Sequence, residues 1–247
     1  MENMILVHQP IAPKEVRRIP DAAKAVQKEW DKLHQMGAWD LASVREMSEL
    51  KSEYRAKQKV AHFGAVFSLC HKKNSEMSSE HWRYKGRVVF QGNNVNDENN
   101  QYAIYSDRST TSNHHSSGKW LDFIGKLDGN HIQDSDAVSA YTQATLDGAD
   151  TWVILPRDQW PRGKGWERFH QPCVKLKVAL YGHPLAGLFW ENKCRTAVKT
   201  CGFEPVPGWE CLYFHKDKRL FLSVYVDDFK MAGRASSIAP MLSLIHI

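Results

Sequence analysis

The stretch LFLSVYVDDFKMAG, residues 220–233, joins a strand-like apolar run to two adjacent carboxylates, Asp227 and Asp228. The aromatic, aliphatic and β-branched residues at 220–226 predict a buried strand that ends at these acids. Two ionised carboxylates side by side raise each other's pKa unless a cation neutralises them. Mg²⁺ suits this role because it prefers oxygen ligands and substrate phosphates. A solvated hairpin turn is the alternative interpretation of the bare Asp-Asp pair.

A metal site needs a third carboxylate, because two neighbouring residues of one turn rarely hold a metal alone. The segment IQDSDAVSAYTQATL, residues 132–146, offers Asp134 and Asp136. Three carboxylates suit two-metal phosphoryl transfer, in which one ion lowers the pKa of an attacking hydroxyl and the other stabilises the leaving pyrophosphate. The residues alone leave both candidates open.

The composition is that of an ordinary globular protein. The chain has 247 residues, 42% of them hydrophobic, and a net charge of +5 that permits a polyanionic partner. Its five cysteines form no C-x-x-C pair, which favours reduced thiols in a cytosolic or nuclear protein. No apolar run has membrane-spanning length, and the N-terminus lacks a signal-peptide pattern, so we expect a soluble protein with no membrane partner.

The N-terminal part, residues 1–60, is expected to be mostly helical. Asp21 can cap a first helix that ends at Gly37. Ser43 and Glu46 have the spacing of a capping box and predict the start of a second helix.

The remainder of the chain mixes strands and helices without regular alternation, which predicts an α+β fold. Residues 62–73 and 84–92 are expected to form a hairpin, and residues 93–101 and 106–118 are expected to be polar loops. Further strands are predicted at 151–156, 172–177, 211–215 and 220–226, and a helix at 188–203.

The motif YVDD after an apolar strand resembles the metal-binding motif of reverse transcriptases. Four blocks, in order and at comparable spacing, resemble the reverse transcriptase domain of copia-type LTR retrotransposon Pol polyproteins over residues 60–233. YKGRVVFQG from Tyr84 is similar to the family's YKARLVARG, and DAVSAYTQATL from Asp136 to DVKTAFLNGDL. CVKLKVALYGHPLAGLFW from Cys173 is similar to CKLKKALYGLKQAPRAW, and FLSVYVDDFKMAG to LLVYVDDLLITG.

The resemblance implies the fingers and palm of a polymerase right hand over residues 61–241, with an antiparallel palm sheet packed on helices. Residues 1–60 become a helical N-terminal extension, and the thumb is expected to be absent or incomplete. The last six residues, LSLIHI at 242–247, are what a transposase adapter used in sequencing libraries encodes. We therefore hypothesise that they are an artefact.

By the same resemblance, Asp136, Asp227 and Asp228 hold two Mg²⁺ ions, for which Mn²⁺ can substitute. Asp136 is preferred to Asp134 because Tyr141 stands five residues after it, where the family has an aromatic residue. Tyr141 would exclude a ribose 2′-hydroxyl and so favour deoxynucleotides. A core aromatic is its alternative interpretation.

The resemblance also suggests where the nucleotide and primer bind. Lys85 and Arg87 share one face of a strand and would hold the incoming triphosphate, unless they belong to a merely solvated basic strand. Tyr225 and Val226 would pack near the primer end. Leu185 stands where the family has a glutamine thought to support the template–nucleotide pair, which puts efficiency or fidelity in doubt.

The function that the resemblance implies is that of an RNA-directed DNA polymerase. Its partners would be an RNA or DNA template–primer, deoxynucleoside triphosphates, and the integrase and ribonuclease H parts of a Pol polyprotein. It would act in the cytoplasm, with a virus-like particle or the nucleus as alternatives. Two rival interpretations are a catalytically inactive, transposon-derived remnant that at most binds nucleic acid, and an unrelated metal-dependent nuclease.

Overall fold

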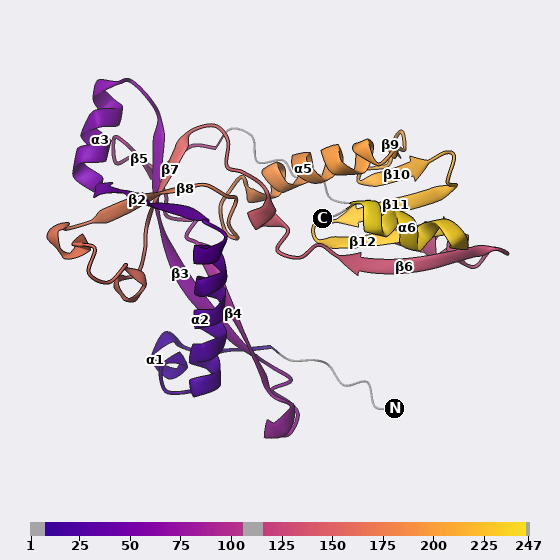
Figure 1. Cartoon of the computed structure of the whole chain (residues 1–247), viewed down its shortest axis with the longest axis horizontal. Helices are drawn as coiled ribbons and strands as arrows, with labels where there is room; N and C mark the ends of the chain where they lie inside the picture. Colours follow the sequence, from indigo (N-terminus) through magenta and orange to yellow (C-terminus); the bar gives the residue numbers. More distant parts are fainter. Residues whose placement is uncertain (1–7, 106–115, 246–247) are drawn as a thin grey trace. The chain divides into compact units, whose positions relative to one another are not determined.

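The computed structural model describes residues 8–105 and 116–245, which form two compact units. Unit 1 comprises residues 1–104 and 146–184, and unit 2 comprises residues 105–145 and 185–247. The chain therefore passes from unit 1 into unit 2 twice, after residue 104 and again after residue 184, and it ends in unit 2 (Figure 1).

Unit 1 is built on a sheet with the strand order β1-β3-β7-β8-β2, to which β4 and β5 add by pairing with β3. Only the β3–β7 pair is parallel among the described strands. The strands are β1 (Gln9–Pro10), β2 (Trp39–Glu46), β3 (Ala61–Lys73), β4 (Arg83–Phe90), β5 (Asn96–Asp97), β7 (Asp150–Ile154) and β8 (Pro172–Leu176). The helices are α1 (Pro13–Val16), α2 (Pro20–Gln35) and α3 (Met47–Ala56), with 3-10 turns η1 (Ser79–His81), η3 (Arg157–Gln159) and η4 (Trp166–Arg168).

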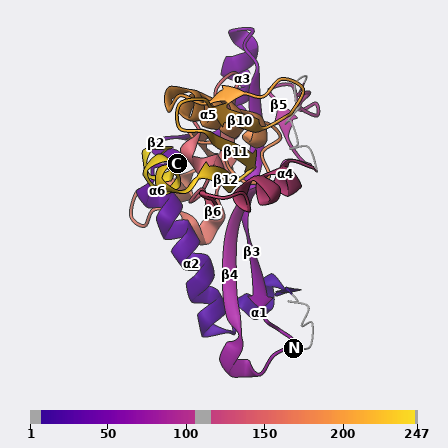
Figure 2. The same cartoon turned by 90° about the vertical axis from the view of Figure 1, so that its right-hand side faces the viewer.

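Helix α2 lies along the long β3–β4 hairpin (Figures 1 and 2). The indole of Trp30 is almost fully buried there and donates a hydrogen bond to the Ser68 hydroxyl at 3.0 Å. Gly86 allows the close approach, because a Cβ at this position would come within 2.5 Å of the Ala25 carbonyl oxygen. On the other helix, Leu50 and Tyr54 of α3 pack on the sheet in a separate apolar cluster with Phe63 of β3, Trp152 and Cys173.

The predicted β-hairpin is confirmed as β3–β4, but the predicted helix starts were wrong. Residues 39–46 form β2, and α3 begins only at Met47. The Ser43 hydroxyl accepts a hydrogen bond from the Lys175 amide, and the Glu46 carboxylate accepts the amides of residues 170 and 171. These side chains therefore join β2 to the β8 segment instead of capping a helix, so residues 1–60 contribute strands as well as helices.

The N-cap of the first long helix lies two residues before the predicted one. Helix α2 begins at Pro20, with Ile19 as its N-cap, so Asp21 lies in the first turn. Proline is favoured at the first helical position because its φ is already helical and its missing N–H would have no partner there. Gly37 follows the helix with φ +65°, as its stop signal predicted.

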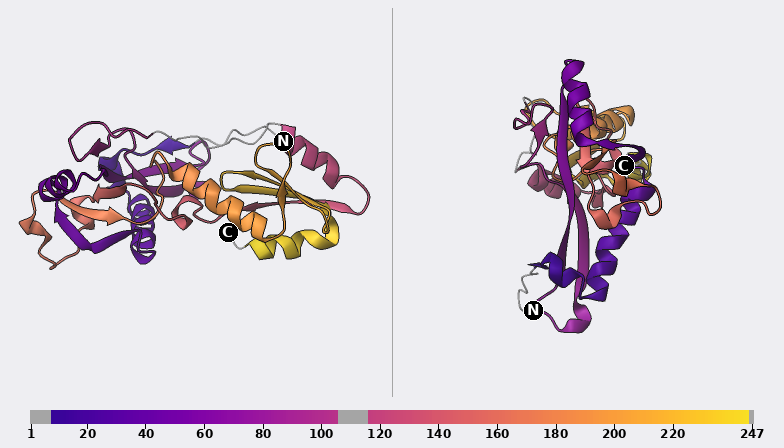
Figure 3. Two further views of the ribbon diagram at one scale, coloured as in Figure 1. Left: turned by 90° about the horizontal axis from the view of Figure 1, so that it is seen from above. Right: turned by 90° about the vertical axis from the view of Figure 1, so that its left-hand side faces the viewer.

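Unit 2 is built on an antiparallel sheet with the strand order β6-β12-β11-β10-β9. Helices α5 and α6 cover one face and α4 covers the other (Figure 3). The core on the α5 and α6 face includes Trp190, Val198, Leu222, Met231 and Ile238, all nearly inaccessible to solvent. The strands are β6 (Asn130–Asp136), β9 (Glu204–Pro205), β10 (Leu212–His215), β11 (Leu220–Tyr225) and β12 (Asp228–Arg234). The helices are α4 (Ser116–Gly125), α5 (Ala186–Thr200) and α6 (Ala235–Ile245), with the 3-10 turn η2 (Tyr141–Gln143).

The mixed α+β prediction is confirmed, but α4 and α6 were not predicted, and β6 was not identified as a strand. Of the polar loop expected at 106–118, residues 106–115 lie outside the described part, and the remainder starts α4. Helix α6 includes residues 242–245, and residues 246–247 lie outside the described part. No helix within the described ranges is long and apolar enough to cross a membrane.

Candidate metal centre

The β11–β12 hairpin carries the two adjacent carboxylates at its turn. Tyr225 pairs with Asp228, so Val226 and Asp227 form a two-residue turn. Val226 has φ +54°, a conformation that a β-branched residue rarely adopts. Positive φ at the first turn residue matches the right-handed twist of two hairpin strands, which explains why this turn can be so short. The hairpin therefore presents Asp227 and Asp228 at one end of the sheet.

Strand β6 brings the third carboxylate to the same place. It pairs antiparallel with β12, and the register puts Asp136 directly opposite Asp228. The Ala137 amide donates a hydrogen bond to the Asp227 carbonyl oxygen at 2.7 Å, which ties the residue after β6 to the turn. One ligand oxygen from each of Asp136, Asp227 and Asp228 lies within 4.8 Å of the other two.

These three side chains form a concentration of negative charge. Partial burial raises the pKa of Asp228, and the neighbouring carboxylates of Asp227, Asp136 and Asp134 raise it further. No salt bridge joins any of the three clustered acids to another described residue. Clustered oxygen ligands with uncompensated charge fit a hard divalent cation such as Mg²⁺ or Mn²⁺. The donor set therefore suits the metal expected from the sequence.

Asp134, the other sequence candidate, lies outside this cluster. It stands two residues before Asp136 on the same strand and pairs with Lys230 of β12. The Lys230 ammonium is bound to the Asp122 carboxylate at 2.8 Å. The strand register thus separates two acids that their residue types left as alternatives and between which the family resemblance preferred Asp136.

Tyr141 lies at the start of η2, in the same unit as the three acids. Burial raises the pKa of its phenol, and the charges of Asp227 and Tyr225 raise it further, so its hydroxyl stays neutral. Tyr141 also packs against the unit 2 core, as its alternative interpretation expects. Tyr225 and Val226 are 57% and 39% exposed, so both present side-chain surface at the hairpin.

Lys85 and Arg87 lie on β4 in unit 1, so they do not belong to the unit that holds the three acids. Their cross-strand partners on β3 are His71 and Leu69. This alternation puts both cations on the face of β4 opposite to Gly86, which packs against α2. The Arg87 guanidinium lies 5.5 Å from the centre of the Tyr181 ring.

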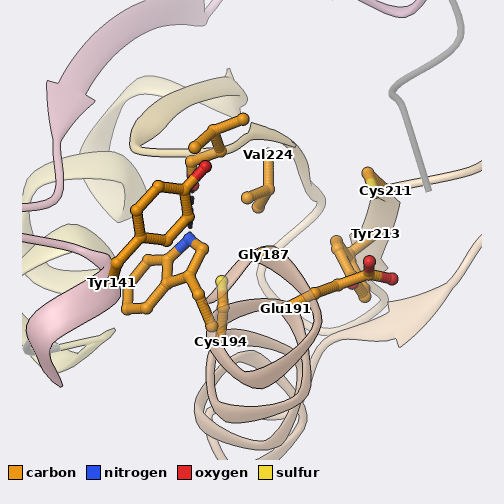
Figure 4. Close-up of a pocket in the computed structure, with 9 residues that line it drawn as sticks. Tyr141, Gly187, Glu191, Cys194, Cys211, Tyr213 and Val224 are labelled. Carbon is orange, nitrogen blue, oxygen red and sulfur yellow. Dashed lines mark hydrogen bonds between the residues drawn. The ribbon is translucent and has the colours of Figure 1, made fainter. Parts of the chain in front are cut away.

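A small pocket of about 60 Å³ lies beneath the hairpin, within unit 2 (Figure 4). Its walls come from α5, from the η2 segment, and from β10 and β11, including the hairpin turn. The sequence predicted Tyr141 and Val226 as site residues but gave no sign that Glu191 and Cys194 would line the same pocket. Helical spacing could only place those two on α5. Leu185, the departure from the family pattern, is the N-cap residue of that helix.

Comparison with known proteins identifies the family. A family model described as reverse transcriptase (RNA-dependent DNA polymerase) matches residues 49–242. The chain belongs to this family. The predicted resemblance to copia-type retrotransposon reverse transcriptases is thereby confirmed, and the curated relatives agree with it.

These relatives are yeast transposon polyproteins. The Transposon Ty1-BL Gag-Pol polyprotein of Saccharomyces cerevisiae is 30% identical over 110 residues, which cover 44% of this chain and 6% of that protein. The Truncated transposon Ty1-A Gag-Pol polyprotein and the Transposon Ty1-DR5 Gag-Pol polyprotein of the same yeast are each 26% identical over 88 residues, or 35% of this chain. The matched parts cover 7% and 5% of those two proteins, so this reverse transcriptase chain corresponds to a small portion of each relative.

Proposed function

We propose that this reverse transcriptase chain catalyses RNA-directed DNA synthesis at Asp136, Asp227 and Asp228. The supporting observation is the convergence of three carboxylates from two segments of a chain that belongs to the family. In the proposed reaction, a primer 3′-hydroxyl attacks the α-phosphate of a deoxynucleoside triphosphate. The new phosphodiester bond forms as the bond to the β-phosphate breaks and pyrophosphate leaves.

The protein's part in this reaction is to hold charge and orient the reactants. Divalent metal, when bound, supplies a lowered hydroxyl pKa and neutralises the leaving phosphates. The three acids provide oxygen ligands on a rigid strand pair. We assign unit 2 to the palm and unit 1 to the fingers, because the acids lie in unit 2 and the basic β4 lies in unit 1.

The remaining site residues take the roles that their chemistry supports. Lys85 and Arg87 bind the triphosphate, and the planar Arg87 fork suits two phosphate oxygens. Tyr141 excludes a ribose 2′-hydroxyl, and its neutral hydroxyl beside Asp227 is compatible with that role. Tyr225 and Val226 contact the primer end. The partners are a template–primer, deoxynucleotides, and the other parts of a Pol polyprotein.

Primer extension on an RNA template tests this function. The 247-residue chain is expected to extend a DNA primer with Mg²⁺ or Mn²⁺, and Asp227→Asn is expected to lower the rate roughly hundredfold or more. Asp134→Asn is the matched control, because it removes a nearby acid of β6 that lies outside the cluster. We expect it to retain activity within about threefold, since it leaves the metal ligands intact.

Two results would reject the proposal. Wild-type protein that binds the template–primer without extending it would favour the inactive remnant, for which Leu185 is the motivating observation. Metal-dependent cleavage of the template, abolished by Asp227→Asn, would favour the nuclease.

A further inference from the structure

The turn that carries Asp227 needs external support, because its backbone is unfavourable for its own sequence. Val226 adopts φ +54°, where its branched side chain crowds the backbone. Such conformations persist only where the surrounding structure holds them in place. A relaxed turn would move both Asp227, which is part of it, and Asp228, which follows it. The groups that hold this turn therefore also set the geometry of the carboxylate cluster.

The carbonyl groups of both turn residues are held by donors from outside the hairpin. The Trp190 indole Nε1 donates a hydrogen bond to the Val226 carbonyl oxygen at 2.7 Å. The Ala137 amide donates to the Asp227 carbonyl oxygen at the same distance. Ala137 adjoins the third acid, Asp136, whereas Trp190 belongs to α5, which supplies none of the acids.

Helix α5 gives the indole a fixed position. Ala186, Trp190, Cys194 and Val198 recur every four residues and are all buried, so this stripe anchors the helix on the sheet. The Trp190 side chain is only 2% exposed. It lines the pocket beneath the hairpin together with Tyr141 and Val226, and its burial leaves the ring little room to move. A confined donor with a single N–H holds its acceptor in one direction.

We propose that Trp190 is a positioning residue for the metal centre, holding the turn so that Asp227 and Asp228 converge with Asp136. This inference rests on the proposed function for its metal, but the restraint on the turn is a property of the metal-free protein. A tryptophan that only fills the core would affect folding stability without a specific effect on metal affinity. Removal of the indole N–H alone therefore distinguishes the two roles: it weakens metal binding if Trp190 positions the turn, and it does not if Trp190 only fills the core.

The test compares Trp190→Phe with Trp160→Phe. Trp160 also donates its indole N–H to a main-chain carbonyl, that of Leu155 at 3.0 Å, but it lies in unit 1. Mn²⁺ affinity is measured by electron paramagnetic resonance of the free ion. Trp190→Phe is expected to weaken Mn²⁺ binding about threefold to tenfold, the usual effect of one lost hydrogen bond. Trp160→Phe is expected to leave Mn²⁺ affinity unchanged.

Hydrogen exchange without metal gives an independent readout. The amides of residues 224–229 are expected to exchange several-fold faster in Trp190→Phe than in the wild type. Because phenylalanine leaves a cavity, a second variant carries benzothienylalanine at position 190, which replaces the N–H by sulfur at nearly constant volume. If Trp190→Phe does not fold, the benzothienylalanine variant takes its place in both experiments. It is expected to show the same weaker Mn²⁺ binding and the same faster exchange of residues 224–229.

Three outcomes are informative. Unchanged Mn²⁺ affinity and unchanged exchange in the isostere, beside a wild type that binds Mn²⁺, overturn the inference and leave the proposed function standing. A wild type that binds no Mn²⁺ overturns the proposed function and the metal part of this inference together. Weaker Mn²⁺ binding and faster amide exchange in the isostere, with Mn²⁺ affinity unchanged in Trp160→Phe, support the positioning role of Trp190 and the metal site on which it rests.

Discussion

Replacement of Asp136 by asparagine is expected to stabilise the metal-free protein while removing most of its response to divalent metal. Asp136 is the informative position because it is distant in sequence from Asp227 and Asp228. Its repulsion with those two acids therefore arises on folding and is largely absent from the unfolded chain. Asparagine keeps the size and shape of the side chain but not its charge.

The magnitude follows from the cluster geometry. Its ligand oxygens lie within 4.8 Å of one another. Two unit charges at that separation repel by about 0.9 kcal/mol in the dielectric of water. Asp136 is exposed and has two such neighbours, so screening by salt leaves a total of about 1 kcal/mol. For a protein of this size, that corresponds to an increase of about 2–4 °C in Tm.

Thermal unfolding in EDTA and in excess Mn²⁺ measures both effects. In EDTA, Asp136→Asn should unfold at the higher temperature. With Mn²⁺ at about one hundred times its Kd, the wild type should gain about 2.7 kcal/mol and become the more stable protein. Asp134→Asn, outside the cluster, should keep the metal response. An Asp136→Asn variant that is no more stable than the wild type in EDTA would refute the repulsion, and an equal gain from Mn²⁺ in both proteins would refute the role of Asp136 as a metal ligand.

Three further outcomes are expected. Burial lowers the pKa of His183 to about 4 in the folded protein. Between pH 6.5 and pH 4 the unfolded chain therefore binds more protons at this residue than the folded protein does. The free energy of unfolding is expected to fall as the pH falls through this range, by up to about 3 kcal/mol. Urea unfolding should show a smaller loss in His183→Gln, and an equal loss would contradict this. Gly86→Ala should lower the free energy of unfolding by about 1–3 kcal/mol, because the added Cβ meets the α2 backbone. Gly118→Ala is the control: its Cβ has no atom within 4 Å, so in the same urea experiment this variant should be neutral or stabilising. Tyr141→Val should raise ribonucleotide incorporation relative to deoxynucleotide incorporation about tenfold or more, and Tyr141→Phe should not. If single-nucleotide kinetics show no change in Tyr141→Val, then Tyr141 does not exclude the ribose 2′-hydroxyl.

Local patterns were sufficient where an element's own residues decide its structure. The β3–β4 hairpin and helix α5 follow from β-branched runs and from the four-residue stripe around Trp190. Local patterns were insufficient for β6, whose sequence NHIQDSD is polar and mostly exposed. That strand forms because β12 pairs with its backbone. Likewise Ser43 and Glu46 have a helix-capping pattern, yet their side chains bond to a distant segment.

The order of the motifs was enough to identify the family, and by resemblance it singled out Asp136, Asp227 and Asp228 as the proposed metal ligands. Between Asp136 and Asp134, the resemblance gave a preference for Asp136, whereas the residue types alone gave none. Both acids lie on β6 two positions apart, so they share a face of the strand. Only the register with β12, which pairs Asp136 with Asp228, puts one of them in the cluster.

The residue types and their order thus specify the family to which this chain belongs and the oxygen ligands of its proposed metal site. Tertiary structure decides the geometry, since the distance between acids from two segments depends on strand pairing. The bond from Trp190 to the Val226 carbonyl depends in addition on how α5 packs. Such long-range contacts leave no local pattern, because each partner's sequence is compatible with many others.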